Sequence, residues 1–105
     1  MDIRVFISQP MRGKSNEEII KERKKAYENI KRLYPNDNII VIDSFLKDAP
    51  YDENQLFYLS HALILLSTAD VAYFTKDYYN ARGCKIEYEF ALNYGIDIID
   101  EVTLD

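Results

Sequence analysis

Four short, mostly apolar runs divide the chain. They cover residues 3–7, 39–42, 71–74 and 96–99, and β-branched residues are frequent in them. Runs of this length are typical of strands buried on both faces, whereas a helix needs a longer segment. The pattern therefore predicts four buried strands.

Longer segments with helical spacing separate these runs. The first predicted helix begins at Ser15. Ser15 and Glu18 have the S-x-x-E spacing of a capping box. Lys and Glu residues fill one side of this helix as a solvated face. Apolar residues recur on the other side: Ile19, Ile20, Tyr27, Ile30, Leu33 and Tyr34.

Two more helices are predicted, over residues 54–67 and from about residue 82 to residue 94. The helix over residues 54–67 is apolar around most of its surface, so we expect it to be largely buried, in part against another subunit. In the last helix, Ile86, Phe90 and Tyr94 mark the expected buried stripe and place Glu87 at its margin. Gly95 is expected to end this helix.

Strands that alternate with helices predict an α/β fold with helices on both faces of the sheet. We expect a small doubly wound, flavodoxin-like or Rossmann-like sheet that is mainly parallel and has four to five strands. A chain of 105 residues buries one modest core, so residues 1–105 should form a single domain that gains stability as a homodimer or higher homo-oligomer. The acidic tail from Asp100 is expected to fray or to lie at an interface.

Charge and composition narrow the range of partners. A net charge of −5 and a pI of about 4.8 argue against binding to a nucleic-acid polymer, which needs a basic face. No apolar run has the length of a membrane span, no secretory signal segment opens the sequence, and Cys84 is the single cysteine. We therefore predict a cytoplasmic protein without membrane contact. Zinc-like spacings, a dinucleotide fingerprint and a phosphate-binding loop motif are all missing from the sequence, so no metal and no cofactor are expected.

The candidate chemistry lies where the predicted strands end. In parallel α/β sheets, ligands bind outside the carboxyl ends of the strands, which selects the loops after Ile7, Ile42 and Phe74. Glu87 lies one turn into the following helix and is the carboxylate expected to point into a cleft. The candidate ligand-binding residues of the loops are Ser8, Gln9, Pro10, Met11, Arg12, Asp43, Tyr78, Asn80, Arg82 and Gly83.

Each of these residues also has an ordinary structural explanation. A carboxylate such as Glu87 near a helix N-terminus complements the helix dipole, which is worth about 0.3–1 kcal/mol. Arg82 and Gly83 fit a loop-to-helix junction, and Tyr78 fits core packing. Their convergence on one edge of the sheet favours a functional interpretation.

Two motifs carry a resemblance to a known family. The chain resembles the nucleoside 2-deoxyribosyltransferase-like superfamily, and most closely its short uncharacterised branch, which pairs I-S-G-P-M-x-G with a later S-R-G-x-x-x-E-x-E-x-A-x-x-x-G. The likeness covers nearly the whole chain in matching order. The matching residues here are Ile7-Ser8-Gln9-Pro10-Met11-Arg12-Gly13 and, later, Ala81-Arg82-Gly83, Glu87, Glu89, Ala91 and Gly95.

The resemblance implies a role for Glu87. In the transferases the matching glutamate is the catalytic nucleophile that attacks the anomeric carbon of a deoxynucleoside, as in retaining glycosyl transfer. This sequence departs from the family pattern, because Ala81 and Ala62 stand where transferases carry polar side chains. Gln9 replaces the usual glycine, and Tyr78 stands where branch members often have tryptophan and is a candidate to stack on a base.

Three functions follow from these observations. The first is binding of a nucleoside, nucleotide or nucleotide-derived signalling molecule, which is sequestered or sensed with catalysis weakened or lost; Arg12 and Arg82 would meet a phosphate. The alternative is an active N-glycosyl transferase or hydrolase, that is, a nucleoside 2-deoxyribosyltransferase or nucleotide N-glycosidase with Glu87 as nucleophile. The third is an interaction module in which Glu87 only stabilises its helix.

Overall fold

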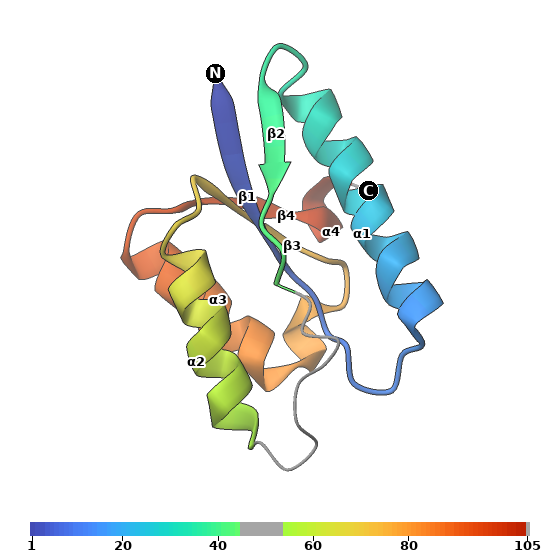
Figure 1. Cartoon of the computed structure of the whole chain (residues 1–105), viewed down its shortest axis with the longest axis vertical. Coiled ribbons are helices and arrows are strands. Elements are labelled where there is room, and N and C mark those ends of the chain that lie inside the picture. The colour runs from blue at the N-terminus through green and yellow to red at the C-terminus, as the bar shows by residue number, and fades with distance from the viewer. Residues whose placement is uncertain (45–53, 105) are drawn as a thin grey trace.

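The described residues build one sheet of four parallel strands in the order β2-β1-β3-β4 (Figure 1). The computed structural model describes residues 1–44 and 54–104. The strands are β1 (Asp2–Ser8), β2 (Asn38–Val41), β3 (Val71–Phe74) and β4 (Asp97–Asp100). Val5 of β1 pairs with Val41 on one side and with Val71 on the other, so β1 is an inner strand. The prediction of a mainly parallel sheet is confirmed.

The helices cover both faces of this sheet, which makes the fold a doubly wound, Rossmann-like α/β fold. The helical elements are α1 (Asn16–Leu33), α2 (Gln55–Leu66), the short 3-10 helix η1 (Tyr78–Asn80), α3 (Arg82–Asn93) and α4 (Glu101–Leu104). Ala26 and Ile30 of α1 share a core cluster with Val5 and Ile7 on one face. Helices α2 and α3 cover the other face, where Leu66 and Ala91 join Phe6.

The alternation of β1 decides which face each of its side chains reaches. Successive side chains of a strand point to opposite faces, so Val5 and Ile7 face α1 while Phe6 faces α2 and α3. Ser8 follows the same alternation and points to the α3 side. The capping box predicted at the start of α1 is confirmed, because the side chains of Ser15 and Glu18 each accept a bond from the other's backbone N–H.

The predicted buried stripe of α3 is wrong. The buried residues are Cys84, Glu87 and Ala91, whereas Phe90 is 41% exposed and Tyr94 is 76% exposed. Small side chains let the helix approach the sheet closely, and the two aromatic rings stack on each other at the surface with centroids 6.1 Å apart. Glu87 therefore lies on the buried face itself and not at its margin.

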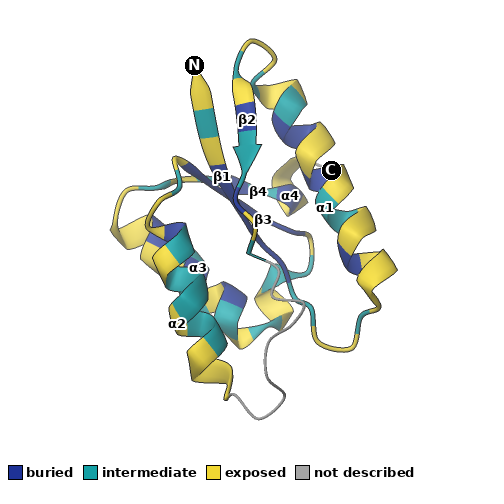
Figure 2. Cartoon of the chain, viewed as in Figure 1, coloured by how far each residue is buried: buried dark blue, intermediate teal, exposed yellow. Residues whose placement is uncertain are grey.

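Within the single chain, α2 is less buried than expected, and its expected burial against another subunit stays a prediction. Leu66 alone among its residues is buried, while Leu56, Phe57 and Ile64 are exposed. Figure 2 shows mostly exposed and half-buried positions along α2. Among the described elements, the sheet and α3 cover one side of α2, although its apolar residues continue around the helix. The apolar side of α1 is likewise narrower than its sequence predicts, since Ile20, Tyr27 and Leu33 are exposed.

The acidic tail does not fray where the structure describes it. Glu101 opens α4 and is buried, with 4% of its surface exposed. Its carboxylate accepts hydrogen bonds from the Tyr73 hydroxyl at 2.9 Å and from the Lys76 backbone N–H at 2.5 Å. These bonds join the tail to β3 and to the loop that follows it. In the described part of the chain, no helix is long and apolar enough to cross a membrane.

Candidate functional site

The chain leaves β1 and β3 in opposite directions across the sheet. β1 connects to β2 on one side and β3 connects to β4 on the other, so the loops after these adjacent strands diverge. Such a switch point is the usual ligand-binding position in open α/β sheets. The strand ends are held together there by a hydrogen bond from the Thr75 N–H to the Ser8 carbonyl at 3.1 Å.

Glu87 lies behind this edge, on the buried face of α3. Its carboxylate accepts a hydrogen bond of 2.6 Å from the Ser8 hydroxyl, and 7% of its surface is exposed. Burial raises the pKa of Glu87 to about 7, although the bond from Ser8 acts in the opposite direction. Near neutral pH the group is therefore available both as a carboxylic acid and as a carboxylate.

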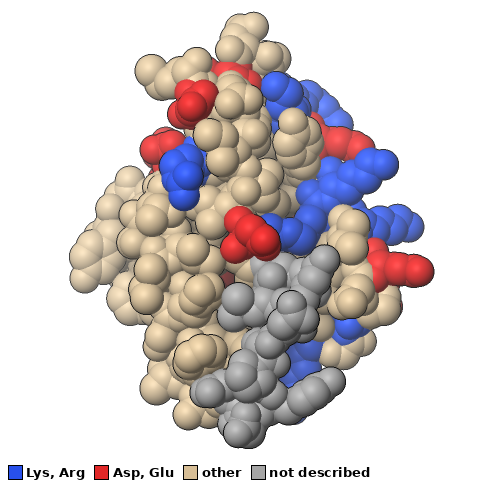
Figure 3. Space-filling view, in the orientation of Figure 1, with Lys and Arg blue, Asp and Glu red and all other residues tan. Residues whose placement is uncertain are grey.

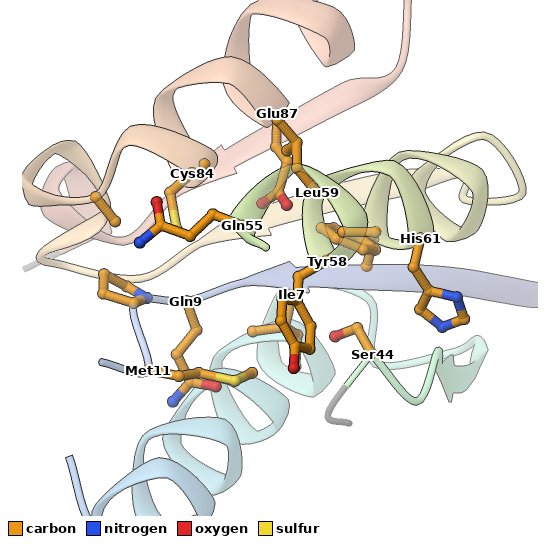
Figure 4. A pocket seen from close by; sticks show the side chains of 15 residues that line it. Ile7, Gln9, Met11, Ser44, Gln55, Tyr58, Leu59, His61, Cys84 and Glu87 are labelled. Atoms are coloured by element: carbon orange, nitrogen blue, oxygen red, sulfur yellow. The ribbon is translucent and has the colours of Figure 1, made fainter. Parts of the chain in front are cut away.

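The Glu87 side chain points into a cavity of about 350 Å³ between β1, α2 and α3 (Figure 4). This volume is at the lower end of the range typical of small-molecule sites. The lining of this cavity is largely apolar and includes a few polar side chains. The lining residues are Phe6, Ile7, Gln9, Pro10, Met11, Ser44, Gln55, Tyr58, Leu59, His61, Ala62, Ala81, Gly83, Cys84 and Glu87.

A second, more polar hollow of about 880 Å³ adjoins the first. Both are lined by Pro10, Gln55, Tyr58, Ala81 and Gly83, so they are neighbouring parts of one cleft. We call the cavity of about 350 Å³ the inner part of the cleft and the hollow of about 880 Å³ its outer part. The further residues of the outer part are Arg12, Lys14, Asp77, Asn80 and Arg82.

Lys14 joins the two rims of the outer part. Its ammonium group lies 2.7 Å from the Asp77 carboxylate in the loop after β3 and 2.9 Å from the Glu22 carboxylate in α1. Burial alone would lower the pKa of Lys14, but its bonds to Asp77 and Glu22 outweigh that effect and raise it. For Asp77, burial acts to raise the pKa, and the bond from Lys14 outweighs it and holds the pKa below its usual value.

The first turn of α3 borders both parts of the cleft. Its N-cap residue is Ala81, which makes no side-chain hydrogen bond to the helix. Backbone N–H groups at a helix start lack partners within the helix and carry partial positive charge. Gly83 lies in this turn and lines both parts of the cleft, so the backbone there is open to a ligand.

Most of the predicted site residues come together in this cleft. The inner part collects Gln9, Pro10, Met11, Gly83 and Glu87, and the outer part collects Arg12, Asn80 and Arg82. Ser8 lies behind Glu87 as its hydrogen-bond donor. The Gln9 amide turns toward α1, where it donates to the Ile19 carbonyl at 3.0 Å and to Glu22 at 2.8 Å.

Two predicted residues lie elsewhere. Asp43 is exposed after β2 and lines neither part of the cleft. Tyr78 lies outside both linings as well, because its ring stacks on Tyr88 at a centroid distance of 5.3 Å and packs edge-on against Phe74. The stack with Tyr88 uses one face of the Tyr78 ring and holds the ring outside the cleft.

The sequence analysis missed several lining residues. Gln55, Tyr58 and Leu59 of α2 were overlooked because that helix was interpreted as core. A glutamine and a tyrosine in the first turns of a mostly apolar helix were the available signal. Lys14 gave no local signal, since its partners Glu22 and Asp77 lie 8 and 63 positions away.

The described residues contain no group of three His, Cys, Asp or Glu side chains that could hold a metal ion. Among the described residues that line the inner part, Glu87 is the one carboxylate and His61 the one imidazole. This donor set suits hydrogen bonding to a polar organic ligand better than metal coordination.

Comparison with known proteins supports the fold. No protein-family model and no curated protein matches the chain. Among solved structures, the chain is similar to the crystal structure of a conserved protein from Enterococcus faecalis V583, with a TM-score of 0.59 and 15% sequence identity. The similarity covers 95% of this chain and 63% of that one, so this chain spans less than two thirds of that protein's length. At this identity, the likeness shows a shared α/β fold.

Proposed function

We propose that the cleft binds a nucleoside, a nucleotide or a nucleotide-derived signalling molecule, and that the protein sequesters or senses it with little or no turnover. The observation that carries this proposal is the division of the cleft. Its inner part is largely apolar and contains the buried carboxyl group of Glu87, and its outer part is lined by Arg12 and Arg82. A nucleotide matches this division, because its flat ring and sugar suit the inner part and its phosphate suits the outer part.

The inner part suits the ring and the sugar. Tyr58, Leu59 and Met11 offer aromatic and aliphatic surface, and pockets of this kind use a few polar groups to fix orientation. Glu87 is such a group, because it is held by Ser8 and can either donate or accept a hydrogen bond near neutral pH. A sugar hydroxyl or a base edge would satisfy it.

The outer part suits a phosphate. Guanidinium groups bind phosphate through paired hydrogen bonds, and both Arg12 and Arg82 are exposed on this side. The uncapped first turn of α3 adds backbone N–H groups and the positive end of the helix dipole. These features favour a phosphorylated ligand over a neutral nucleoside.

The carboxyl groups around the cleft are poorly suited to glycosyl transfer, which favours weak turnover. Glycosyl transfer requires an ionised nucleophile and help for the departing base. The pKa of Glu87 near 7 leaves much of it protonated, and Asp77, the other carboxylate among the described lining residues, is engaged by Lys14. Ala62 and Ala81, which both line the inner part, offer no polar side chain.

An active N-glycosidase or deoxyribosyltransferase is the second candidate. The supporting observation is that the Glu87 carboxyl group faces the cavity and is held by Ser8. A carboxylate in that position would attack an anomeric carbon and form a glycosyl-enzyme, with the electrons of the broken C–N bond leaving on the base. We propose on the same grounds that the chain is related to the nucleoside 2-deoxyribosyltransferase-like superfamily. Self-association and a cytoplasmic setting also remain predictions.

Calorimetric titration with deoxynucleosides, nucleoside monophosphates and cyclic nucleotides tests the proposal, with released base followed by chromatography. We expect binding without base release. Arg12→Ala should weaken binding of phosphorylated ligands about 10-fold or more and leave nucleoside binding nearly unchanged. Arg32→Ala is the matched control, since Arg32 is an exposed arginine in the last turn of α1 and lines neither part of the cleft.

The other outcomes are equally informative. Base release that disappears in Glu87→Gln would replace the binding proposal by the enzymatic one. If no ligand of the panel binds at millimolar concentration, both proposals fail and the interaction module is favoured.

A further inference from the structure

Arg23 of α1 is a half-buried cation next to the inner part of the cleft. Its guanidinium group donates to the Ile42 carbonyl at 3.3 Å, and to the Ser44 hydroxyl and the Gln9 side-chain oxygen at 3.5 Å each. Burial lowers the pKa of Arg23, and the charge of Asp43 acts in the opposite direction. Arg23 itself lines neither part of the cleft, so its charge lies behind the wall that Ser44 and Gln9 help to form.

The bond from Arg23 determines how the Ser44 hydroxyl can bind a ligand. A hydroxyl group has one hydrogen to donate and two lone pairs with which to accept. Arg23 uses one lone pair, and the hydroxyl hydrogen has no acceptor among the described residues. The guanidinium charge also polarises the hydroxyl group and makes it a stronger donor. Ser44 therefore presents a hydrogen-bond donor to the inner part.

Ser44 lies at the end of the inner part that is remote from the outer part. It lines the inner part alone, whereas Gln55 lines both parts. In Figure 4, Ser44 and His61 lie on one side of Tyr58, and Gln55 lies on the other. A nucleotide with its phosphate in the outer part would therefore bring the far edge of its ring to Ser44.

We infer that the Ser44 hydroxyl, held by Arg23, binds a carbonyl oxygen on the ring of the ligand. An oxo base such as uracil or hypoxanthine presents an acceptor there, whereas cytosine and adenine present an amino group. The cleft then selects nucleotides with an oxo base over those with an amino base. This selection rests on the proposed binding of a nucleotide and adds the chemical class of the base.

The charges around Ser44 favour a neutral acceptor over a second phosphate. Arg23 supplies one positive charge, and the carboxylate of Asp43 opposes it. Figure 3 shows acidic and basic side chains next to each other on the surface near the end of β2. A phosphate needs positive charge that is not already balanced, whereas a carbonyl oxygen needs only a donor. An amino group would leave the Ser44 hydrogen without an acceptor, which costs binding energy.

Calorimetric titration of the full chain with two matched pairs of ligands tests this subsite. The pairs are inosine and adenosine monophosphate, and uridine and cytidine monophosphate. In each pair that binds, we expect the oxo member to bind the wild type about 10-fold more tightly. Ser44→Ala and Arg23→Met should each reduce this ratio to about 3-fold or less, whereas Ser44→Thr keeps the hydroxyl group and should keep the ratio. The ratio is the readout, because a general loss of structure weakens both members of a pair alike.

Ser60→Ala and Arg32→Met are the matched controls and should keep the wild-type ratio. Both residues are exposed and line neither part of the cleft. Circular dichroism confirms that each variant is folded. Equal affinities within the pairs, or tighter binding of the amino member, would overturn the subsite and leave the proposed function standing. So would a ratio that Ser44→Ala leaves unchanged. If no member of either pair binds, the proposed function fails and the subsite fails with it.

Discussion

The Ser8 hydroxyl donates a hydrogen bond of 2.6 Å to the Glu87 carboxylate, although 79 positions separate the two residues. The bond connects the carboxyl end of an inner strand to the buried face of α3, at the wall of the cleft. It stabilises the ionised form of Glu87, while burial stabilises the neutral form. The balance of these two effects gives the protein a group that changes charge near neutral pH.

Glu87 should make the stability of the protein depend on pH. Its pKa is 4.5 ordinarily and about 7 in the folded state, so the folded state holds the proton more tightly. The resulting stabilisation is fully present below about pH 4.5 and is lost as the pH rises through about 7. The shift corresponds to on the order of 3 kcal/mol. Urea denaturation at pH values from about 5 to about 8.5 measures this loss.

Glu87→Gln cannot ionise and should lose this pH dependence. Above about pH 8 it should exceed the wild type by about 1–3 kcal/mol in free energy of unfolding, because the amide oxygen still accepts the Ser8 hydroxyl. Glu89→Gln, at an exposed position of the same helix, should keep the wild-type profile. Equal pH profiles of wild type and Glu87→Gln would contradict the assigned environment of Glu87.

Lys14 should stabilise the fold by tying two loops of the cleft together. Lys14→Met keeps most of the side-chain length but removes the bonds to Asp77 and Glu22. Both carboxylates are about a third exposed, so solvent weakens the ion pairs. We expect a loss of about 1–2 kcal/mol in free energy of unfolding, measured by urea denaturation at neutral pH.

A double-mutant cycle isolates the Lys14–Asp77 pair. The effects of Lys14→Met and Asp77→Asn should be non-additive by at least about 0.5 kcal/mol. The contribution of Asp77 should be present above its ordinary pKa of 3.8 and disappear as the pH falls through its lower folded value. Lys21→Met, at an exposed position of α1, is the control and should have little effect. If the effects of Lys14→Met and Asp77→Asn are additive, the Lys14–Asp77 pair contributes nothing to stability.

Cys84 should be unreactive in the folded protein. Its thiol lines the inner part of the cleft but is buried, and burial raises its pKa to about 12. Because the thiolate is the reactive form, reaction with a disulfide reagent near pH 8 should be at least about a hundredfold slower in the native protein than in urea. A ligand in the inner part should slow it further.

A cysteine introduced at Asn93 provides the control for this reaction. Asn93 is exposed near the end of the same helix, and the variant also carries Cys84→Ala. Its native and denatured rates should be similar. If Cys84 in the native protein reacts as fast as that exposed thiol, then the inner part of the cleft is more open than its burial indicates.

Much of the fold and part of the site were accessible from the sequence because their signals are local. The apolar runs place the strands, and the Ser15–Glu18 spacing places the start of α1. Once a parallel sheet is expected, the rule for strand ends leads to Pro10, Arg12 and Gly83 in the cleft. The same rule predicted Tyr78 as a ligand-binding residue, but its ring stacks on Tyr88 and does not line the cleft.

The errors concern which side of a helix is covered. Helical spacing alone predicted that Phe90 and Tyr94 of α3 face the sheet. In the structure, the smaller side chains of Cys84 and Ala91 are buried there. The spacing of apolar residues tells which side chains share a face, but not how closely a neighbouring layer approaches that face. The burial of Glu101 was missed for a similar reason, because its partner Tyr73 lies 28 positions earlier on β3.

The sequence by itself determined the order of strands and helices, the α/β class and the edge at which chemistry-bearing residues gather. These features depend on residues that are neighbours along the chain. Only the tertiary structure decided that Ser8 contacts Glu87, that Lys14 contacts Asp77 and that Leu56 and Ile64 of α2 are exposed. Such relationships depend on how separate elements pack, and packing is settled by the shape and size of surfaces that are distant in sequence.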